Sequence, residues 1–180
     1  TTSMNTAVHS EAPREDLVGQ EQLLIRKSIA LLSSGMEPFK AIREMLHLLS
    51  ELLGLNRGRL VMRDTSSKPS SGELAIRVAY GLTQDEIGRG RYAMGEGITG
   101  RVMQSGETLI VQDIDSEPAY LARAIDRAKL PAETVSFIAM PIMLNRNVLG
   151  VLGVHRLRSR QRPLGADLQI LHMIADLMGQ

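Results

Sequence analysis

Apolar residues in the first third of the chain recur at helical spacing. From about residue 17 to 32, and again from Pro38 to residue 53, they return every three or four positions, as on one face of an α-helix. A Ser-Ser-Gly break at 33–35 separates the two runs, and Gly54 is a suitable helix end. The pattern predicts two successive helices. The apolar positions of the second are Phe39, Ile42, Met45, Leu46, Leu49, Leu52 and Leu53.

After residue 55 the apolar period shortens to two, which is typical of strands. Leu60 and Met62 predict a short strand, and residues 64–72, rich in Ser, Pro and Gly, predict a hairpin loop. Thr83 lies three residues before Glu86, the spacing of a capping box at the start of a short helix. The next strand is expected to bury one face through strictly alternating residues. They are Leu74, Ile76, Val78 and Tyr80.

A glycine-rich turn occupies residues 95–102, with the sequence Gly-Glu-Gly-Ile-Thr-Gly-Arg-Val. It follows an expected strand at 91–94 and opens an expected helix at 98–104. Gly95 and Gly97 suit positive φ angles, and Gly100 suits close packing. The free N–H groups at the helix start also suit an anionic ligand, so a structural role and a ligand contact both remain open. The turn is no dinucleotide fingerprint, because no βαβ unit follows it.

The last third predicts a central hairpin and a final helix. Apolar runs at 136–144 and 148–156 flank a short Asn-Arg-Asn connection, which favours an antiparallel pair. A strand at 109–111, a helix at 118–129 and a helix at 164–178 complete the elements. Strands mixed with helices, without strict βαβ alternation, indicate an α+β fold with an antiparallel sheet. Alternating arginines at 156–162 predict either a solvated strand end or a contact to an anionic partner.

Composition narrows the possible functions. The 21 basic and 20 acidic residues give a net charge of +1, which argues against a nucleic-acid-binding surface. The absence of cysteine excludes disulfides, thiolate nucleophiles and iron–sulfur clusters. No apolar run reaches the ~18 residues that a membrane span needs. Residues 1–16 are polar and aperiodic, so we expect a disordered N-terminal segment or tag remnant there and one folded domain over 17–180.

Several of these markers occur in a familiar order. The glycine turn is followed by a loop with Asp113, Pro118 and Tyr120, then by Phe-Ile-Ala-Met-Pro-Ile at 137–142 and Val-Leu-Gly-Val-Leu at 148–152. This order, over about residues 20–180, resembles a GAF domain. In detail it is similar to the N-terminal sensory domains of NifA-type nitrogen-fixation regulators, which are sigma-54-dependent transcriptional activators. No Gly-x-x-x-x-Gly-Lys-Ser/Thr loop of their ATPase occurs here, so we expect an excised input domain.

The resemblance implies a GAF-like six-stranded antiparallel sheet with helices on both faces. The first, second and last helices are expected on one face, while the glycine turn, its helix and segment 118–129 roof a pocket on the other. It also implies a cytoplasmic homodimer that binds a small metabolite, with 2-oxoglutarate as a candidate, or a nitrogen-signalling protein. Direct nucleic-acid contact, membrane contact, cofactors and catalysis are not expected. Some GAF relatives reduce free methionine sulfoxide, but they use cysteines.

Binding-site residues are expected where aromatic and cationic side chains meet the roof. Apolar walls with few polar groups are typical of small-molecule sites, and a dicarboxylate also needs a cation. Core packing of the aromatics and a surface position for each arginine are the structural alternatives. His155 and the acidic group at 113–117 predict structural roles rather than a metal site. The expected ligand-binding residues are Tyr92, Glu96, Thr99, Arg101, Tyr120, Arg123, Phe137 and Met140.

Overall fold

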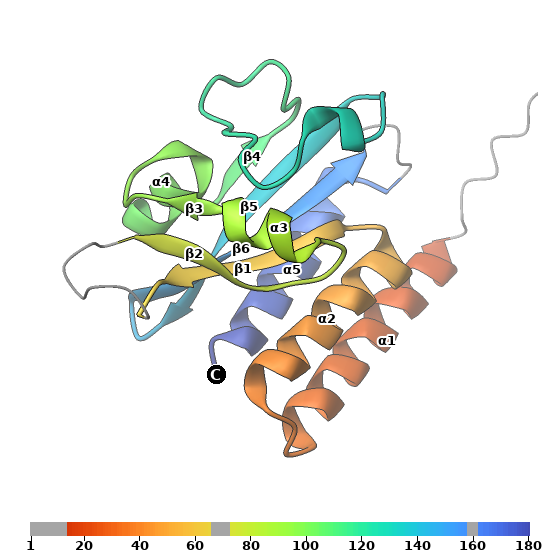
Figure 1. The fold of residues 1–180 in the computed structure, drawn as a ribbon. Coiled ribbons are helices and arrows are strands. Elements are labelled where there is room, and N and C mark those ends of the chain that lie inside the picture. Colours follow the sequence, from red (N-terminus) through yellow and green to blue (C-terminus); the bar gives the residue numbers. More distant parts are fainter. Residues whose placement is uncertain (1–13, 66–72, 158–161) are drawn as a thin grey trace, which may run out of the picture.

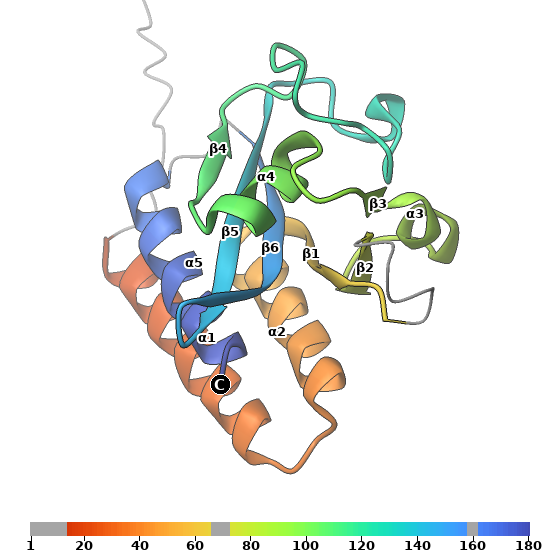
Figure 2. The ribbon, with the colours of Figure 1, turned by 90° about the vertical axis from the view of Figure 1, so that its left-hand side faces the viewer.

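A computed structural model describes residues 14–65, 73–157 and 162–180. Three long helices cover one face of a six-stranded sheet, and shorter elements lie on the other face (Figures 1 and 2). The strand order is β3-β2-β1-β6-β5-β4, with every neighbouring pair antiparallel. The expected α+β fold and its layers are confirmed. The elements are α1 (Arg14–Ser33), α2 (Pro38–Leu53), β1 (Asn56–Arg63), β2 (Leu74–Ala79), α3 (Gln84–Arg89), β3 (Arg91–Tyr92), α4 (Gly97–Ser105), β4 (Leu109–Val111), the 3₁₀ turn η1 (Arg127–Lys129), β5 (Val135–Leu144), β6 (Asn147–Leu157) and α5 (Leu164–Met178).

The helical layer follows from the apolar periodicity and from capping. The Glu37 carboxylate accepts hydrogen bonds from the backbone N–H groups of Phe39 and Lys40, which have no partner within α2. Gly54 ends the helix in the left-handed conformation, with φ 62°. Helix α1 begins at Arg14, so the part of the predicted disordered segment before it lies outside the described residues.

Each long strand buries both of its faces, one in each core. In β5, Ile138, Met140 and Ile142 pack in the helix-side core. Val135, Phe137 and Ala139 pack in the core on the other face. A strand covered on both faces reads as a continuous apolar run, which explains the sequence at 136–144.

The prediction that β2 buries only one of its faces is wrong. The β1–β2 register shifts between Leu60, which opposes Val78, and Val61, which opposes Ile76. A bulge of this kind adds a residue to one strand and moves later side chains to the other face. Consequently Ile76 lies in one core, whereas Val78 and the partly buried Tyr80 contribute to the other.

The predicted helix at 118–129 is wrong. Apart from η1, residues 112–134 form an irregular segment. Side chains satisfy its backbone in place of a helical ladder, since the Glu117 carboxylate accepts from the Ala119 N–H and the Arg127 guanidinium donates to the carbonyls of Pro131 and Glu133. Ala124, one of the apolar residues of this segment whose spacing is helix-like, is buried although no helix forms there. We call α4 and residues 112–134 together the roof.

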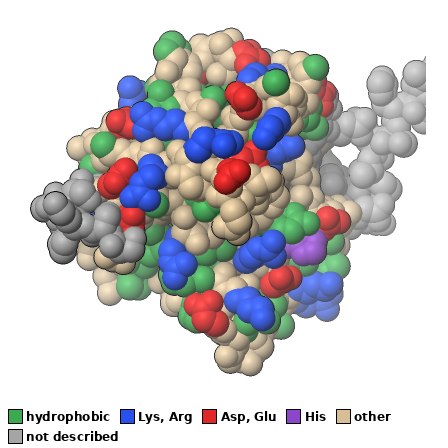
Figure 3. Space-filling view, viewed as in Figure 1, with side chains coloured by type: hydrophobic (Ala, Val, Ile, Leu, Met, Phe, Trp, Pro, Cys, Tyr) green, Lys and Arg blue, Asp and Glu red, His purple; other side chains and the backbone are tan. Residues whose placement is uncertain are grey.

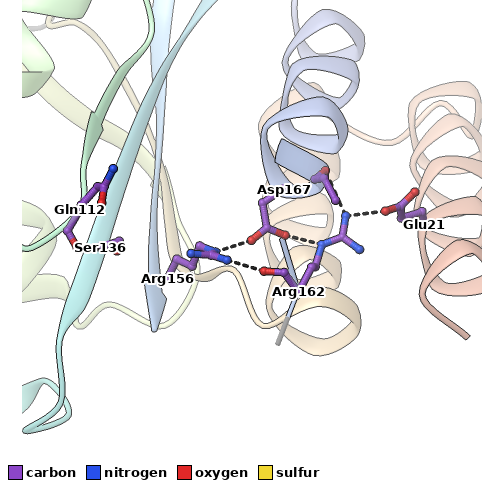
Figure 4. Close-up of polar contacts among 7 residues, drawn as sticks. Glu21, Gln112, Ser136, Arg156, Arg162 and Asp167 are labelled. Carbon is purple, nitrogen blue, oxygen red and sulfur yellow. Dashed lines mark hydrogen bonds and ion pairs between the residues drawn. The ribbon is translucent and has the colours of Figure 1, made fainter. Parts of the chain in front are cut away.

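A buried charge cluster fastens the helices to the sheet (Figure 4). Arg156 of β6 donates from Nε to the fully buried Asp167 of α5 at 2.6 Å. Arg162 also donates to Asp167, and its Nη2 lies 2.5 Å from Glu21 of α1. Neither arginine is therefore a solvated side chain or a free contact for an anionic partner. Arg158 and Arg160 lie outside the described residues.

Candidate functional site

A small, partly open cavity lies between the roof and the sheet. Its volume is about 10 Å³, room for about one water molecule. Residues from β1, β3, α4, β5 and segment 112–134 form its wall. They are Arg59, Tyr92, Ile98, Thr99, Tyr120, Leu121, Ala122, Arg123, Ala124, Ile125 and Phe137.

Arg59 of β1 is the buried cation of this cavity, with only 4% of its surface exposed. Its Nε and Nη2 both donate to the Arg57 carbonyl at 3.1 Å, and its guanidinium lies 5.4 Å from the centre of the Phe137 ring. Gly153 opposes Arg59 on β6, and a Cβ there would lie 2.8 Å from the Phe137 ring. The glycine therefore makes the space in which the ring and the guanidinium meet.

His155 of β6 joins Arg59 to the roof. Its Nε2 lies 2.9 Å from the Tyr120 hydroxyl, and its Nδ1 lies 3.5 Å from Nη2 of Arg59. Burial, and then the nearby positive charge of Arg59, lowers the pKa of His155 well below its ordinary value. The imidazole is therefore neutral. Because a guanidinium only donates, we assign the acceptor role to Nδ1 and the proton to Nε2, which donates to Tyr120.

No carboxylate pairs directly with Arg59, although the charge of Glu86 acts on it from a greater distance. Within the described ranges no ion pair includes Arg59, and its Nη1 has no hydrogen-bond partner. Burial accordingly lowers the pKa of Arg59 from its ordinary value. Burial also raises the pKa of the Tyr120 phenol, so this hydroxyl stays protonated near neutral pH. The cavity thus holds a cation and a neutral hydroxyl without an anion.

A surface hollow of about 320 Å³ lies beside the cavity and shares Tyr92 and Arg123 with its wall. Arg123 donates to the Arg91 carbonyl at 2.8 Å, forms an ion pair with Glu96, and lies over the Tyr92 ring at 5.6 Å. The side chains of the ion pair are 41% and 37% exposed. Exposed pairs of this kind contribute at most about 1 kcal/mol. Arg123 therefore lines both the hollow and the cavity, and its ion pair with Glu96 is a weak one.

The structure brings most of the predicted ligand-binding residues together. Five of them line the cavity, and Glu96 lies in the hollow beside it. Arg101 is exposed on α4 and lines neither space. Met140 faces the opposite side of the sheet, in the helix-side core, because its position on β5 has the other parity from Phe137. The five are Tyr92, Thr99, Tyr120, Arg123 and Phe137.

Arg59 and His155, which lie at or beside the cavity, are not among the ligand-binding residues predicted from the sequence. Arg59 is a charge within the apolar strand Gly-Arg-Leu-Val-Met at 58–62, and this interruption was the available signal. His155 was treated as an isolated histidine, since linear spacing does not show that it lies beside Tyr120.

The acidic residues at 113–117 hold the loop together. Asp113 accepts from the Asp115 N–H and the Ser116 hydroxyl, and Asp115 pairs with Arg127 at 2.8 Å.

In the part of the chain that the structure describes, no three His, Asp or Glu side chains gather as metal ligands. Over the same residues, no helix combines the length and apolar character needed to cross a membrane. Basic and acidic side chains alternate across the face shown in Figure 3.

Because His155 is neutral in the folded chain, we expect mild acidification to lower the free energy of unfolding. Its folded-state pKa lies well below 6.5, so below that pH the unfolded chain binds a proton that the folded chain rejects. The free energy of unfolding should fall by about 1.4 kcal/mol per pH unit from pH ~6.5 down to the folded-state pKa. Urea unfolding between pH 7 and 5 measures this slope. His155→Gln should flatten it, and an unchanged slope in the variant would contradict the assignment.

Family comparison agrees with the layered fold. The family model for the GAF domain matches residues 38–180. The chain therefore belongs to the GAF domain family.

Within that family, the chain is similar to regulators of nitrogen fixation. It is 38% identical over 165 residues to the Nif-specific regulatory protein of Herbaspirillum seropedicae, covering 91% of this chain and 29% of that protein. It is 32% identical over 137 residues to the nitrogen fixation protein VnfA of Azotobacter vinelandii, covering 76% and 26%. The chain thus spans less than a third of the length of these relatives.

Solved structures share the fold at lower identity. The GAF domain of A. aeolicus nlh2 in an inactive state superposes with a TM-score of 0.78 at 23% identity, covering 91% of this chain and 95% of that one. A free methionine-R-sulfoxide reductase from Neisseria meningitidis gives 0.62 at 20% identity, covering 92% and 85%. At this identity the likeness concerns the fold alone.

Proposed function

We propose that this chain is the sensory input domain of a transcriptional activator of nitrogen-fixation genes. It binds a small metabolite under the roof and passes its ligand state to an attached ATPase in the cytoplasm. The similarity to Nif-specific regulatory proteins over 91% of the chain carries this proposal. The first candidate ligand is 2-oxoglutarate, a dicarboxylate whose charge is complementary to the buried Arg59. No cofactor or catalytic step is part of the proposal.

Ligand control requires two conformations with different affinities. The cavity of about 10 Å³ cannot hold a five-carbon acid, which needs well over 100 Å³. On this proposal the narrow cavity belongs to a ligand-free form, and the ligand selects a form with the roof displaced. Segment 112–134 would supply that displacement, since apart from η1 it has no regular structure.

The small volume of the cavity and the outer surface of the helices support a second candidate, a protein-interaction and dimerisation domain with a degenerate pocket. Large apolar side chains are exposed on α1 at Val18, Ile29 and Leu32, and on α5 at Met173. These positions suit a homodimer or a nitrogen-signalling protein. This alternative predicts partner binding that requires no small molecule.

Titration calorimetry with 2-oxoglutarate separates the two functions, with succinate and glutamate as controls. The sensor predicts selective, saturable binding and a higher melting temperature. At a ligand concentration 100-fold above Kd, the added stability should be about 2.7 kcal/mol. Absence of both heat and stabilisation at millimolar 2-oxoglutarate would reject this metabolite and favour the protein-partner function.

A further inference from the structure

We propose that Arg59 is the anchor for the carboxylate of a small organic acid, and that the Tyr120 hydroxyl is its second donor. This inference rests on the proposed sensory function and names the ligand class and the atoms that recognise it. It concerns two side chains that already line one cavity.

Arg59 and Tyr120 retain N–H and O–H groups that donate no hydrogen bond within the described residues. Arg59 uses Nε and one Nη2 hydrogen on the Arg57 carbonyl and directs Nη2 toward His155, while Nη1 has no partner. With the His155 proton on Nε2, the Tyr120 oxygen accepts from the imidazole, and its own hydrogen remains available. A guanidinium N–H and a phenol O–H facing one cavity form a two-donor site for a carboxylate.

Electrostatics favours an anion in this position over any other ligand charge. A buried charge without a partner is costly, and an anion of matching geometry offsets that cost. The groups that line the cavity do not supply one, since Tyr92 and Tyr120 are protonated phenols with raised pKa values. The carboxylate of Glu86 acts on Arg59 electrostatically, but it neither forms an ion pair with Arg59 nor lines the cavity. A cationic or neutral ligand would leave the guanidinium uncompensated.

The path to the anchor passes the side chain of Arg123, which lines both the hollow and the cavity. Hollow and cavity share Tyr92 and Arg123, so displacement of one exposed side chain joins them. An acid that enters from the hollow places one carboxylate on Arg59. In a dicarboxylate, the second carboxylate lies near Arg123 and replaces Glu96 as its partner. The site thus favours short dicarboxylates.

Calorimetry and thermal-shift assays on variants of the same chain test the anchor. Arg59→Met should lose affinity for the best-binding acid by on the order of 100-fold, and Tyr120→Phe by about 10-fold. Arg59→Lys keeps the charge without the planar fork, so its affinity should be intermediate. Arg101→Met is the matched control, because Arg101 is exposed and lines neither space, and its affinity should equal that of the unmodified chain.

The ligand panel consists of 2-oxoglutarate, succinate, acetate, the mono- and diamides of succinate, and inorganic phosphate. Binding of the acids but not of the diamide, with the loss in Arg59→Met, supports the anchor. Equal binding by the unmodified chain and by both Arg59 variants would overturn the anchor while leaving the sensory function intact, as would tight binding of the neutral diamide. Failure of the unmodified chain to bind any member at 10 mM would overturn the anchor and the metabolite-sensing function together. If Arg59→Met is not folded by circular dichroism, Arg59→Lys and Tyr120→Phe decide the outcome.

Discussion

Asp167→Ala should lower the free energy of unfolding by about 3–5 kcal/mol, the usual cost of removing one partner from a buried ion pair. Asp167 is fully buried and accepts from both Arg156 and Arg162 (Figure 4). Without it, Arg156 has no carboxylate in the described part of the chain, and Arg162 retains only Glu21. The substitution therefore leaves buried positive charge with too few partners.

Urea denaturation followed by circular dichroism measures this loss. Asp176→Ala is the matched control, because Asp176 lies on the same helix with its side chain exposed and should change stability by less than about 0.5 kcal/mol. A loss below about 1 kcal/mol in Asp167→Ala would show that water reaches the two arginines and that the cluster is not the fastening described here.

Gly100→Ala should destabilise the domain by about 2–3 kcal/mol, the upper part of the range for overpacking. A Cβ at this position would lie 2.5 Å from the Ala93 carbonyl oxygen and 3.1 Å from the backbone of Gly95. Both contacts are with backbone, which cannot rotate away as a side chain does. The Gly95 N–H also donates to the Gly100 carbonyl at 3.0 Å, so a shift of α4 disrupts the turn that holds it.

The control for this prediction is Gly165→Ala in α5, where a Cβ meets nothing within 4 Å. That variant should change the free energy of unfolding by less than about 0.5 kcal/mol, because Gly165 is the exposed second residue of α5. Thermal unfolding of both variants is a direct measurement. If Gly100→Ala keeps the melting temperature of the unmodified chain, α4 does not pack on the glycine turn as tightly as described.

Local sequence signals were sufficient where one short-range rule determined the structure. The helix at Pro38–Leu53, its end at Gly54 and the capping box of α3 all depend on residues within a few positions of each other. The same is true of the positive φ angles of Gly95 and Gly97, 80° and 63°. These features were predicted because periodicity and backbone sterics act locally.

The errors arose where distant contacts decide the outcome. A bulge against β1 reassigns the faces of β2, and the side chain of Arg127 reaches across segment 112–134 to its carbonyls. Met140 was expected at the ligand, but strand parity turns it toward the helices. Arg59 and His155 are 96 residues apart and meet only through the β1–β6 pairing. No linear spacing contains that information.

The order of two residues on β6 has a thermodynamic consequence. His155 faces the roof and contacts Tyr120, which lines the cavity, while its neighbour Arg156 faces the helices and binds Asp167. A single peptide bond therefore joins the residue that contacts the cavity wall to the residue that attaches α5 to the sheet. Suppose that an acid bound to Arg59 moves this strand and thereby alters the Arg156–Asp167 pair. Linkage then requires the reverse effect: an event that strains the pair changes the affinity of the cavity for the acid by the same factor. A load applied to the terminal helix would then be measurable as a change in metabolite affinity.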